Sequence, residues 1–207
     1  MYERALSGTG RIMSVTMDLP FDRWLPAQRW YSGRGREIAE VRPVVVEALR
    51  SDLDLVLLEV AYIDGPTEDY QVLVRWDAGA PAALIGTDGT RAGFDALADP
   101  EAAGALLSFI EASTQIGPVR FLREPEADLG PGAPVRVLGG EQSNTSVVFG
   151  DRTIFKVFRR VTPGINPDIE LTRALAGNPY VTALYGSYEI DWGAEQYMLG
   201  MASAFAP

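Results

Sequence analysis

The 207-residue chain contains no cysteine and no histidine. Without cysteine it cannot form disulfides, thiolate nucleophiles or zinc–thiolate sites. Without histidine, it has no histidine triad, histidine general base or histidine metal ligand. No apolar run approaches the ~20 residues of a membrane-spanning helix, and residues 1–11 lack the basic-then-apolar pattern of a secretory signal. We therefore expect a cytoplasmic protein.

Positive charge is scarce, because 18 basic residues face 28 acidic ones and give a net charge of −10. This balance argues against nucleic acid as a partner. Lys156 is the only lysine, and the other 17 basic residues are arginines. Lysine carries a compact charge on a thin stem, whereas arginine carries a wide planar fork. The single lysine is therefore expected at a site that arginine cannot serve, although a surface lysine on an exposed strand is the plainer alternative.

The first 90 residues predict a small α+β unit. Residues 21–31 read as a short amphipathic helical segment, in which the near-helical spacing of Trp24, Trp30 and Tyr31 favours core packing over a carbohydrate-stacking platform. Three apolar-rich stretches, 38–49, 53–63 and 70–76, are separated by Ser-Asp and Asp-Gly-Pro turns and predict antiparallel hairpins. Residues 78–88 read as a loop or linker.

Residues 91–133 read as a linking segment with one helix. Asp99 suits the N-cap of a helix that extends to about residue 114, and Pro100 falls in its first turn. Residues 119–123 are a candidate strand, and residues 125–134 resemble a loop.

Residues 134–207 predict a five-stranded antiparallel sheet with one helix after the third strand, which is the arrangement of a protein-kinase-like small lobe. The expected strands cover residues 135–138, 145–149, 153–158, 181–190 and 196–201. The helix is expected over residues 167–176, with Asn166 as its N-cap and Gly177 as its stop.

Three features of this lobe predict a nucleotide site. A Gly-Gly turn with Ser and Thr hydroxyls at 139–146 can line an anion-binding concavity, although alone it is an ordinary hairpin turn. Lys156 follows on a strand between apolar residues. Glu170 lies 14 residues later, in the first turns of the helix, from where a carboxylate can reach the lysine across the sheet. The alternative partner of Glu170 is Arg173 on the same helix.

The motifs at these positions resemble those of the actinobacterial maltokinases. They are Gly140-Glu-Gln-Ser-Asn-Thr-Ser-Val, Lys156-Val-Phe-Arg-Arg and Gly164-Ile-Asn-Pro-Asp-Ile-Glu. Trp24-Leu-Pro-Ala-Gln-Arg-Trp-Tyr-Ser-Gly-Arg and Asp69-Tyr-Gln-Val-Leu-Val-Arg-Trp are similar to the N-terminal cap subdomain of that family. The resemblance extends from about residue 19. It implies an aminoglycoside-phosphotransferase-type kinase fold and transfer of the ATP γ-phosphate to the anomeric hydroxyl of maltose. The product, maltose 1-phosphate, would feed α-glucan (glycogen) synthesis.

The resemblance also implies roles for individual residues. Lys156 would contact phosphate oxygens, Glu170 would orient Lys156, and the backbone near residues 201–205 would form the hinge that meets adenine. The expected nucleotide-binding residues are Gly140, Gln142, Ser143, Asn144, Thr145, Lys156, Met201, Ala202 and Ser203. We expect no metal ligand in this chain, because the family holds Mg²⁺ in a helical lobe that follows the hinge.

Since this chain stops near the proposed hinge, we expect it to have no appreciable kinase activity alone. An open hinge end, residues 197–201, would then form an exposed apolar patch suited to self-association or a partner. Three alternatives stay open: a related kinase for glucosamine or an aminoglycoside, a non-catalytic interaction module, and fusion or association with a trehalose synthase.

Overall fold

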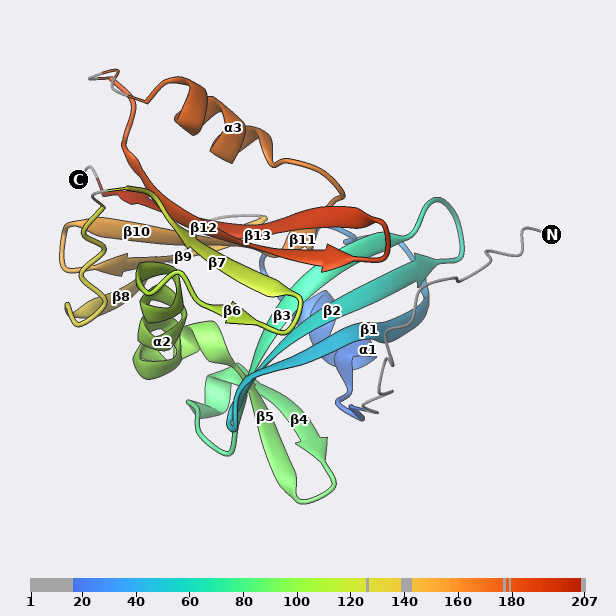
Figure 1. The fold of residues 1–207 in the computed structure, drawn as a ribbon. Coiled ribbons are helices and arrows are strands. Elements are labelled where there is room, and N and C mark those ends of the chain that lie inside the picture. Colours follow the sequence, from blue (N-terminus) through green and yellow to red (C-terminus); the bar gives the residue numbers. More distant parts are fainter. Residues whose placement is uncertain (1–16, 126, 139–142, 177, 179, 206–207) are drawn as a thin grey trace.

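A computed structural model describes residues 17–125, 127–138, 143–176, 178 and 180–205. The described chain is an α+β fold, as the sequence predicts, with two antiparallel sheets and few helices (Figure 1). None of the helices in these ranges is long and apolar enough to cross a membrane.

The first sheet, here called the cap sheet, has the strand order β1-β2-β3-β5-β4. The three predicted hairpin strands are confirmed as β1 (Ile38–Arg50), β2 (Leu53–Tyr62) and β3 (Glu68–Trp76). The predicted loop at residues 78–88 is wrong in its second half, which forms β4 (Leu84–Asp88) against β5 (Arg91–Asp95). Gly89, at φ +60°, makes the tight turn between them. Pairing with β5 thus outweighs the weak strand propensity of the Ala-, Gly- and Pro-rich segment.

One face of the cap sheet is covered by the segment that precedes it. This segment contains α1 (Phe21–Trp24) and a 3₁₀ turn, Leu25–Ala27. Trp24, Trp30 and Tyr31 are only 9%, 6% and 3% exposed. The Trp24 and Trp30 rings meet edge to face, with centroids 5.7 Å apart. The interpretation of these aromatic residues as core is therefore confirmed.

The second sheet, here called the lobe sheet, has seven strands where five were expected. Its order is β6-β7-β12-β13-β10-β9-β8. The two additional strands, β6 (Gln115–Ile116) and β7 (Val119–Arg123), come from the linking segment, and β7 pairs with β12. The remaining strands are β8 (Val135–Leu138), β9 (Asn144–Phe149), β10 (Thr153–Phe158), β12 (Leu184–Trp192) and β13 (Glu195–Ala204).

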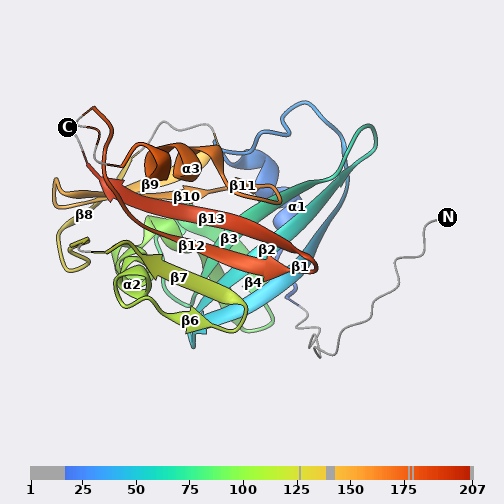
Figure 2. The same ribbon diagram turned by 45° about the horizontal axis from the view of Figure 1, so that its top comes forward.

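Two helices lie on opposite faces of the lobe sheet (Figures 1 and 2). These are α2 (Pro100–Glu111) and α3 (Pro167–Ala174). Both predicted N-caps are confirmed, since the Asp99 side chain accepts a hydrogen bond from Glu101 N and Asn166 accepts one from Asp168 N. α2 buries a broad apolar side, whereas α3 buries only Ile169.

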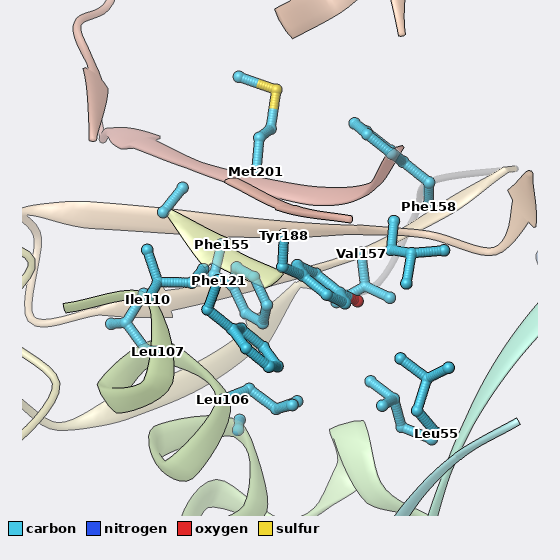
Figure 3. Close-up of a cluster of buried hydrophobic side chains, with 14 of the residues drawn as sticks. Leu55, Leu106, Leu107, Ile110, Phe121, Phe155, Val157, Phe158, Tyr188 and Met201 are labelled. Carbon is cyan, nitrogen blue, oxygen red and sulfur yellow. The ribbon is translucent and has the colours of Figure 1, made fainter. Parts of the chain in front are cut away.

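The main core fills the space between α2, the lobe sheet and the cap sheet. Figure 3 shows Phe121, Phe155 and Tyr188 gathered on the α2 side of the lobe sheet, with Met201 and Phe158 on the other side. Phe121 and Tyr188 stack with centroids 5.4 Å apart. Tyr188 lies opposite Gly200, where an added Cβ would come within 2.4 Å of its ring. Only glycine fits at position 200, because the tyrosine ring packs directly on that backbone.

The cap and the lobe are joined by backbone pairing as well as by the core. The short strand β11 (Arg160–Val161) follows β10 and pairs with β3. Gln71 of β3 is fully buried, and its amide nitrogen donates to the carbonyl oxygens of Phe158 and Leu199. The cap sheet therefore continues directly into the lobe.

The expected apolar patch at residues 197–201 is wrong. Tyr197 and Met198 are each 5% exposed, Leu199 is fully buried and Met201 is 6% exposed. β13 lies between β10 and β12, and these four side chains belong to the main core, which covers what the sequence alone left open.

Candidate nucleotide site

Lys156 lies in the middle of the lobe sheet, on the face that α3 covers. β10 runs between β9 and β13, and Lys156 is directly opposite Ser146 on one side and Met201 on the other. Residues opposite one another in antiparallel strands point to the same face. The Lys156 side chain is 29% exposed, so the ammonium lies at the edge of the α3 contact rather than free in solvent.

The ammonium pairs with Asp168, at 3.5 Å from Nζ to Oδ2, and not with Glu170. The expected Lys156–Glu170 pair is therefore replaced in this structure. α3 begins at Pro167, so Asp168 is in its first turn. Glu170 is two residues further on, about 200° around the helix, and is exposed on the far side. The alternative Glu170–Arg173 pair is not formed either, because Arg173 binds Glu124 at 2.7 Å.

A pocket of about 370 Å³ opens between α3 and the lobe sheet, beside Lys156. Its helix wall carries Asp168, Leu171 and Thr172, which share one face at i, i+3 and i+4. The sheet wall combines the cation with apolar side chains, and this combination suits a ligand that has an anionic part and an aromatic part. The remaining lining residues are Ile154, Thr182, Met201, Ser203, Ala204 and Phe205.

The residues expected at the hinge divide between the two faces of β13. The Met201 and Ser203 side chains line the pocket, whereas Ala202 is fully buried on the core side. Residues 201–204 pair with β10, and residues 201–203 also pair with β12. These backbone groups are therefore engaged within the sheet. The backbone of Phe205 is also tied down, since its N–H donates to Arg152 O.

The residues expected to cover the phosphates also divide between faces. Gly140 and Gln142 lie outside the described residues. Ser143 is exposed, and Asn144 is opposite Phe158, on the Lys156 face. Thr145 is opposite Val157, on the core face, and its hydroxyl accepts a 2.8 Å hydrogen bond from Arg159 Nε. The structure thus brings Asn144 and Ser146, rather than the Thr145 side chain, to the face of Lys156.

Several pocket residues were missed by the sequence reasoning. Ile154 follows from alternation with Lys156 along β10, because side chains repeat with period two in a strand. Asp168 and Thr172 follow from helical spacing, once the phase of α3 is known. Thr182 carries no such signal, since it lies outside regular elements, whereas Phe205 is at the end of the stretch expected to form the hinge.

The pocket itself provides little for a metal ion. Among the described lining residues Asp168 is the one carboxylate, and it already pairs with Lys156. Within the described ranges, no group of three or more acidic residues is arranged to hold a metal ion. Mg²⁺ commonly takes one or two protein carboxylates together with substrate phosphates, and the one carboxylate among the described lining residues is engaged by Lys156.

Comparison with known proteins agrees with this geometry. The family model described as "Maltokinase N-terminal cap domain" matches residues 24–99. A solved structure of glucosamine kinase in complex with glucosamine, ADP and inorganic phosphate has a TM-score of 0.58 at 16% identity, over 92% of this chain and 42% of that one. A second crystal form of glucosamine kinase gives a TM-score of 0.54 at 17% identity, over 90% and 39%.

The solved structures show the fold of the chain, and the family model identifies what residues 24–99 resemble. The chain spans about two fifths of the length of the solved kinases it matches. The resemblance to the maltokinases is confirmed: residues 24–99 match the maltokinase N-terminal cap domain, and nine tenths of the chain has a fold similar to that of glucosamine kinase.

Proposed function

We propose that the pocket beside Lys156 binds ATP and that this chain supplies the phosphate-binding half of a maltokinase-type sugar kinase. The complete enzyme would transfer the ATP γ-phosphate to the anomeric hydroxyl of maltose, in the cytoplasm, giving maltose 1-phosphate for α-glucan (glycogen) synthesis. The observation that carries the proposal is the ammonium of Lys156, which lies beside the pocket and is held by Asp168 at 3.5 Å.

In this proposal each group has a distinct task. Lys156 binds phosphate oxygens as a compact cation, and Asp168 orients it. Asn144, on the same sheet face as Lys156, borders the phosphates. Ile154 and Met201 provide the apolar surface on which the base lies. Mg²⁺, when bound with the nucleotide, would neutralise charge on the phosphates, and its carboxylate ligands are proposed to lie outside these 207 residues.

We further propose that the 207-residue chain alone does not transfer phosphate. Phosphoryl transfer requires a metal-neutralised phosphate and a group that orients the acceptor hydroxyl. The one carboxylate among the described pocket residues is engaged by Lys156, so no carboxylate of the described pocket lining is left for either task. ATP-dependent formation of maltose 1-phosphate by the pure chain would contradict this proposal.

Two acceptor sugars have support. Maltose is favoured because residues 24–99 match the maltokinase cap domain. Glucosamine is the second candidate, because the solved structure with a TM-score of 0.58 contains that sugar together with ADP. Phosphorylation of maltose, glucosamine and an aminoglycoside by the polypeptide that contains this chain would decide between them.

The single lysine allows a direct test of nucleotide binding. Lys156 carries the only side-chain amine, so an amine-acetylating reagent modifies this position and the N-terminus alone. We expect ATP and ADP to slow acetylation of Lys156, but not of the N-terminus, as read by peptide mass spectrometry. Maltose without nucleotide serves as the control and should give no protection. Equal acetylation of Lys156 with and without saturating ATP would overturn the proposal.

A further inference from the structure

Arg159 is a buried arginine that lies three residues after Lys156, at the bend between β10 and β11. Its side chain is 1% exposed. A charged side chain is rarely buried this far unless it is paired and hydrogen-bonded, because loss of water costs more than most single contacts return. The contacts of Arg159 therefore indicate what this residue holds together.

On one side, Arg159 holds the start of β9, where the loop expected to cover the phosphates ends. Its backbone N–H donates to Ser143 O at 3.1 Å. Its Nε donates to the Thr145 hydroxyl at 2.8 Å. These two bonds hold the Ser143 backbone and the Thr145 side chain, on both sides of Asn144, which faces the same side of the sheet as Lys156.

On the other side, Arg159 is held by the cap. Its Nη2 contacts both carboxylate oxygens of Asp95, at 2.9 and 2.7 Å, and Asp95 belongs to β5 of the cap sheet. Its guanidinium carbon lies 4.6 Å from the centre of the Trp30 ring. Its carbonyl oxygen accepts a 2.7 Å hydrogen bond from Gln71 N of β3. A buried charge-assisted bond and a cation–π contact are stronger anchors than neutral hydrogen bonds.

We propose that Arg159 is a positioning residue through which the cap fixes Ser143–Thr145 relative to Lys156, so that the cap sets the nucleotide affinity of the pocket. This inference rests on the proposed nucleotide site. A loop that is already held in its binding position loses less entropy when ligand binds. The contacts of Arg159 with Asp95 and Thr145 are here called the anchor. If the anchor is lost, only a fraction of molecules holds residues 143–145 in the binding position, and the apparent affinity for nucleotide falls by that fraction.

Asp95 and Thr145 allow the anchor to be removed from either side. Asp95→Asn keeps the shape of the side chain but replaces one carboxylate oxygen facing Arg159 by an amide, and Asp95 does not line the pocket. Thr145→Val removes only the hydroxyl that Arg159 Nε donates to. Tyr188→Phe is the matched control, because it also deletes one buried cap–lobe hydrogen bond, to Gln71, without a contact to residues 143–145.

Hydrogen exchange of the peptide containing residues 143–145 and ADP binding are measured on the full 207-residue chain and its three variants. We expect both anchor variants to speed exchange of this peptide and to weaken ADP about three- to tenfold. Tyr188→Phe should lower thermal stability, as the anchor variants do, but leave exchange of the peptide and the ADP Kd within about twofold.

The outcomes separate this inference from the function on which it rests. Unchanged exchange of the peptide in both anchor variants would overturn the inference, whether or not nucleotide binds. An equal loss of ADP affinity in Tyr188→Phe would also overturn it, because the effect would then be one of general stability. Failure of the unaltered chain to bind ADP would refute the proposed function, while hydrogen exchange would still decide whether Arg159 anchors the loop.

Discussion

Gln71 and Tyr188 are 117 residues apart in the sequence, and the Tyr188 hydroxyl donates to Gln71 Oε1 at 2.7 Å in the interior. The Gln71 amide nitrogen donates in turn to two carbonyl oxygens of the lobe sheet. A cap side chain therefore satisfies three polar groups of the lobe. This relationship makes the cap and the lobe parts of one structure rather than two bodies in contact.

Loss of the Gln71 side chain should be far more costly than loss of the Tyr188 hydroxyl. Gln71→Leu leaves the carbonyls of Phe158 and Leu199 and the Tyr188 hydroxyl without a partner, so we expect a loss of ~3 kcal/mol or more in the free energy of unfolding. Tyr188→Phe should cost about 1 kcal/mol. Urea unfolding measures both, with the exposed Gln115→Leu as a control. Equal effects of Gln71→Leu and Gln115→Leu would contradict the central position of Gln71.

Asp168, rather than Glu170, should control the chemical reactivity of Lys156. Asp168→Asn removes the 3.5 Å ion pair and releases the amine. Because both side chains are partly exposed, the pair is expected to contribute about 0.2–1 kcal/mol. Acetylation of Lys156 should therefore become about 1.5- to 5-fold faster in Asp168→Asn, by mass spectrometry. Glu170→Gln is the matched control and should not change the rate. The reverse pattern would restore the pairing expected from the sequence.

Lys156→Arg tests whether the site requires a compact cation. Arginine preserves the positive charge, but its planar fork is wider than an ammonium, and Lys156 stands between Ser146 and Met201 on a packed sheet. We expect Lys156→Arg to weaken ADP binding about tenfold, measured by calorimetry, with little change in thermal stability. Full retention of affinity would mean that only the charge matters and that the single lysine has no special role.

Asp69 gives the stability of the chain a pH dependence. Burial, followed by repulsion from Glu59 and Glu195, raises the pKa of Asp69 from an ordinary 3.8 to about 6. The folded protein therefore binds a proton more tightly than the unfolded chain, and the contribution of Asp69 to stability falls as pH rises from about 4 to about 6. Above that range the ionised carboxylate destabilises the fold by about 1 kcal/mol, after allowance for solvent screening of this half-buried group.

Asp69→Asn should remove this penalty. We expect the variant to exceed the unaltered chain in unfolding free energy at pH 7, and the difference to vanish near pH 4. Urea unfolding across this range provides the measurement. Asp64→Asn, at an exposed turn, should follow the unaltered chain throughout. A difference for Asp69→Asn that does not change with pH would rule out titration of Asp69 as its cause.

Local signals in the sequence were sufficient for most elements. The turns at residues 51–52 and 64–66 separate the three predicted hairpin strands, because Ser, Asp, Gly and Pro interrupt β-rich runs. Asp99 and Asn166 begin helices where predicted, since a short polar side chain satisfies the first free N–H groups. The placement of Lys156 on a strand and the maltokinase-like cap were likewise readable from local motifs.

The predictions that were wrong all depend on which strand pairs with which, or on which face of a helix meets the sheet. The strand β4 forms because β5 is available to pair with it, and β6 and β7 join the lobe sheet because β12 offers an edge. A prediction from one segment contains no information about such partners. Asp168 rather than Glu170 pairs with Lys156 because of where α3 begins and which face of the helix packs on the sheet. That face carries Ile169, the buried residue of α3. Because the two carboxylates are two residues apart, a shift of two residues in the phase of α3 would place Glu170 where Asp168 now lies.

The amino-acid order by itself determined most of the strands, the helix starts, the buried aromatic residues of the cap and the strand position of Lys156, because each depends on neighbours within a few positions. Only the tertiary structure decided that Asp168 meets Lys156, that Thr145 turns away toward Arg159, and that residues 197–201 are covered. These outcomes depend on strand register, helix phase and sheet order, which are set by contacts between residues far apart in the chain.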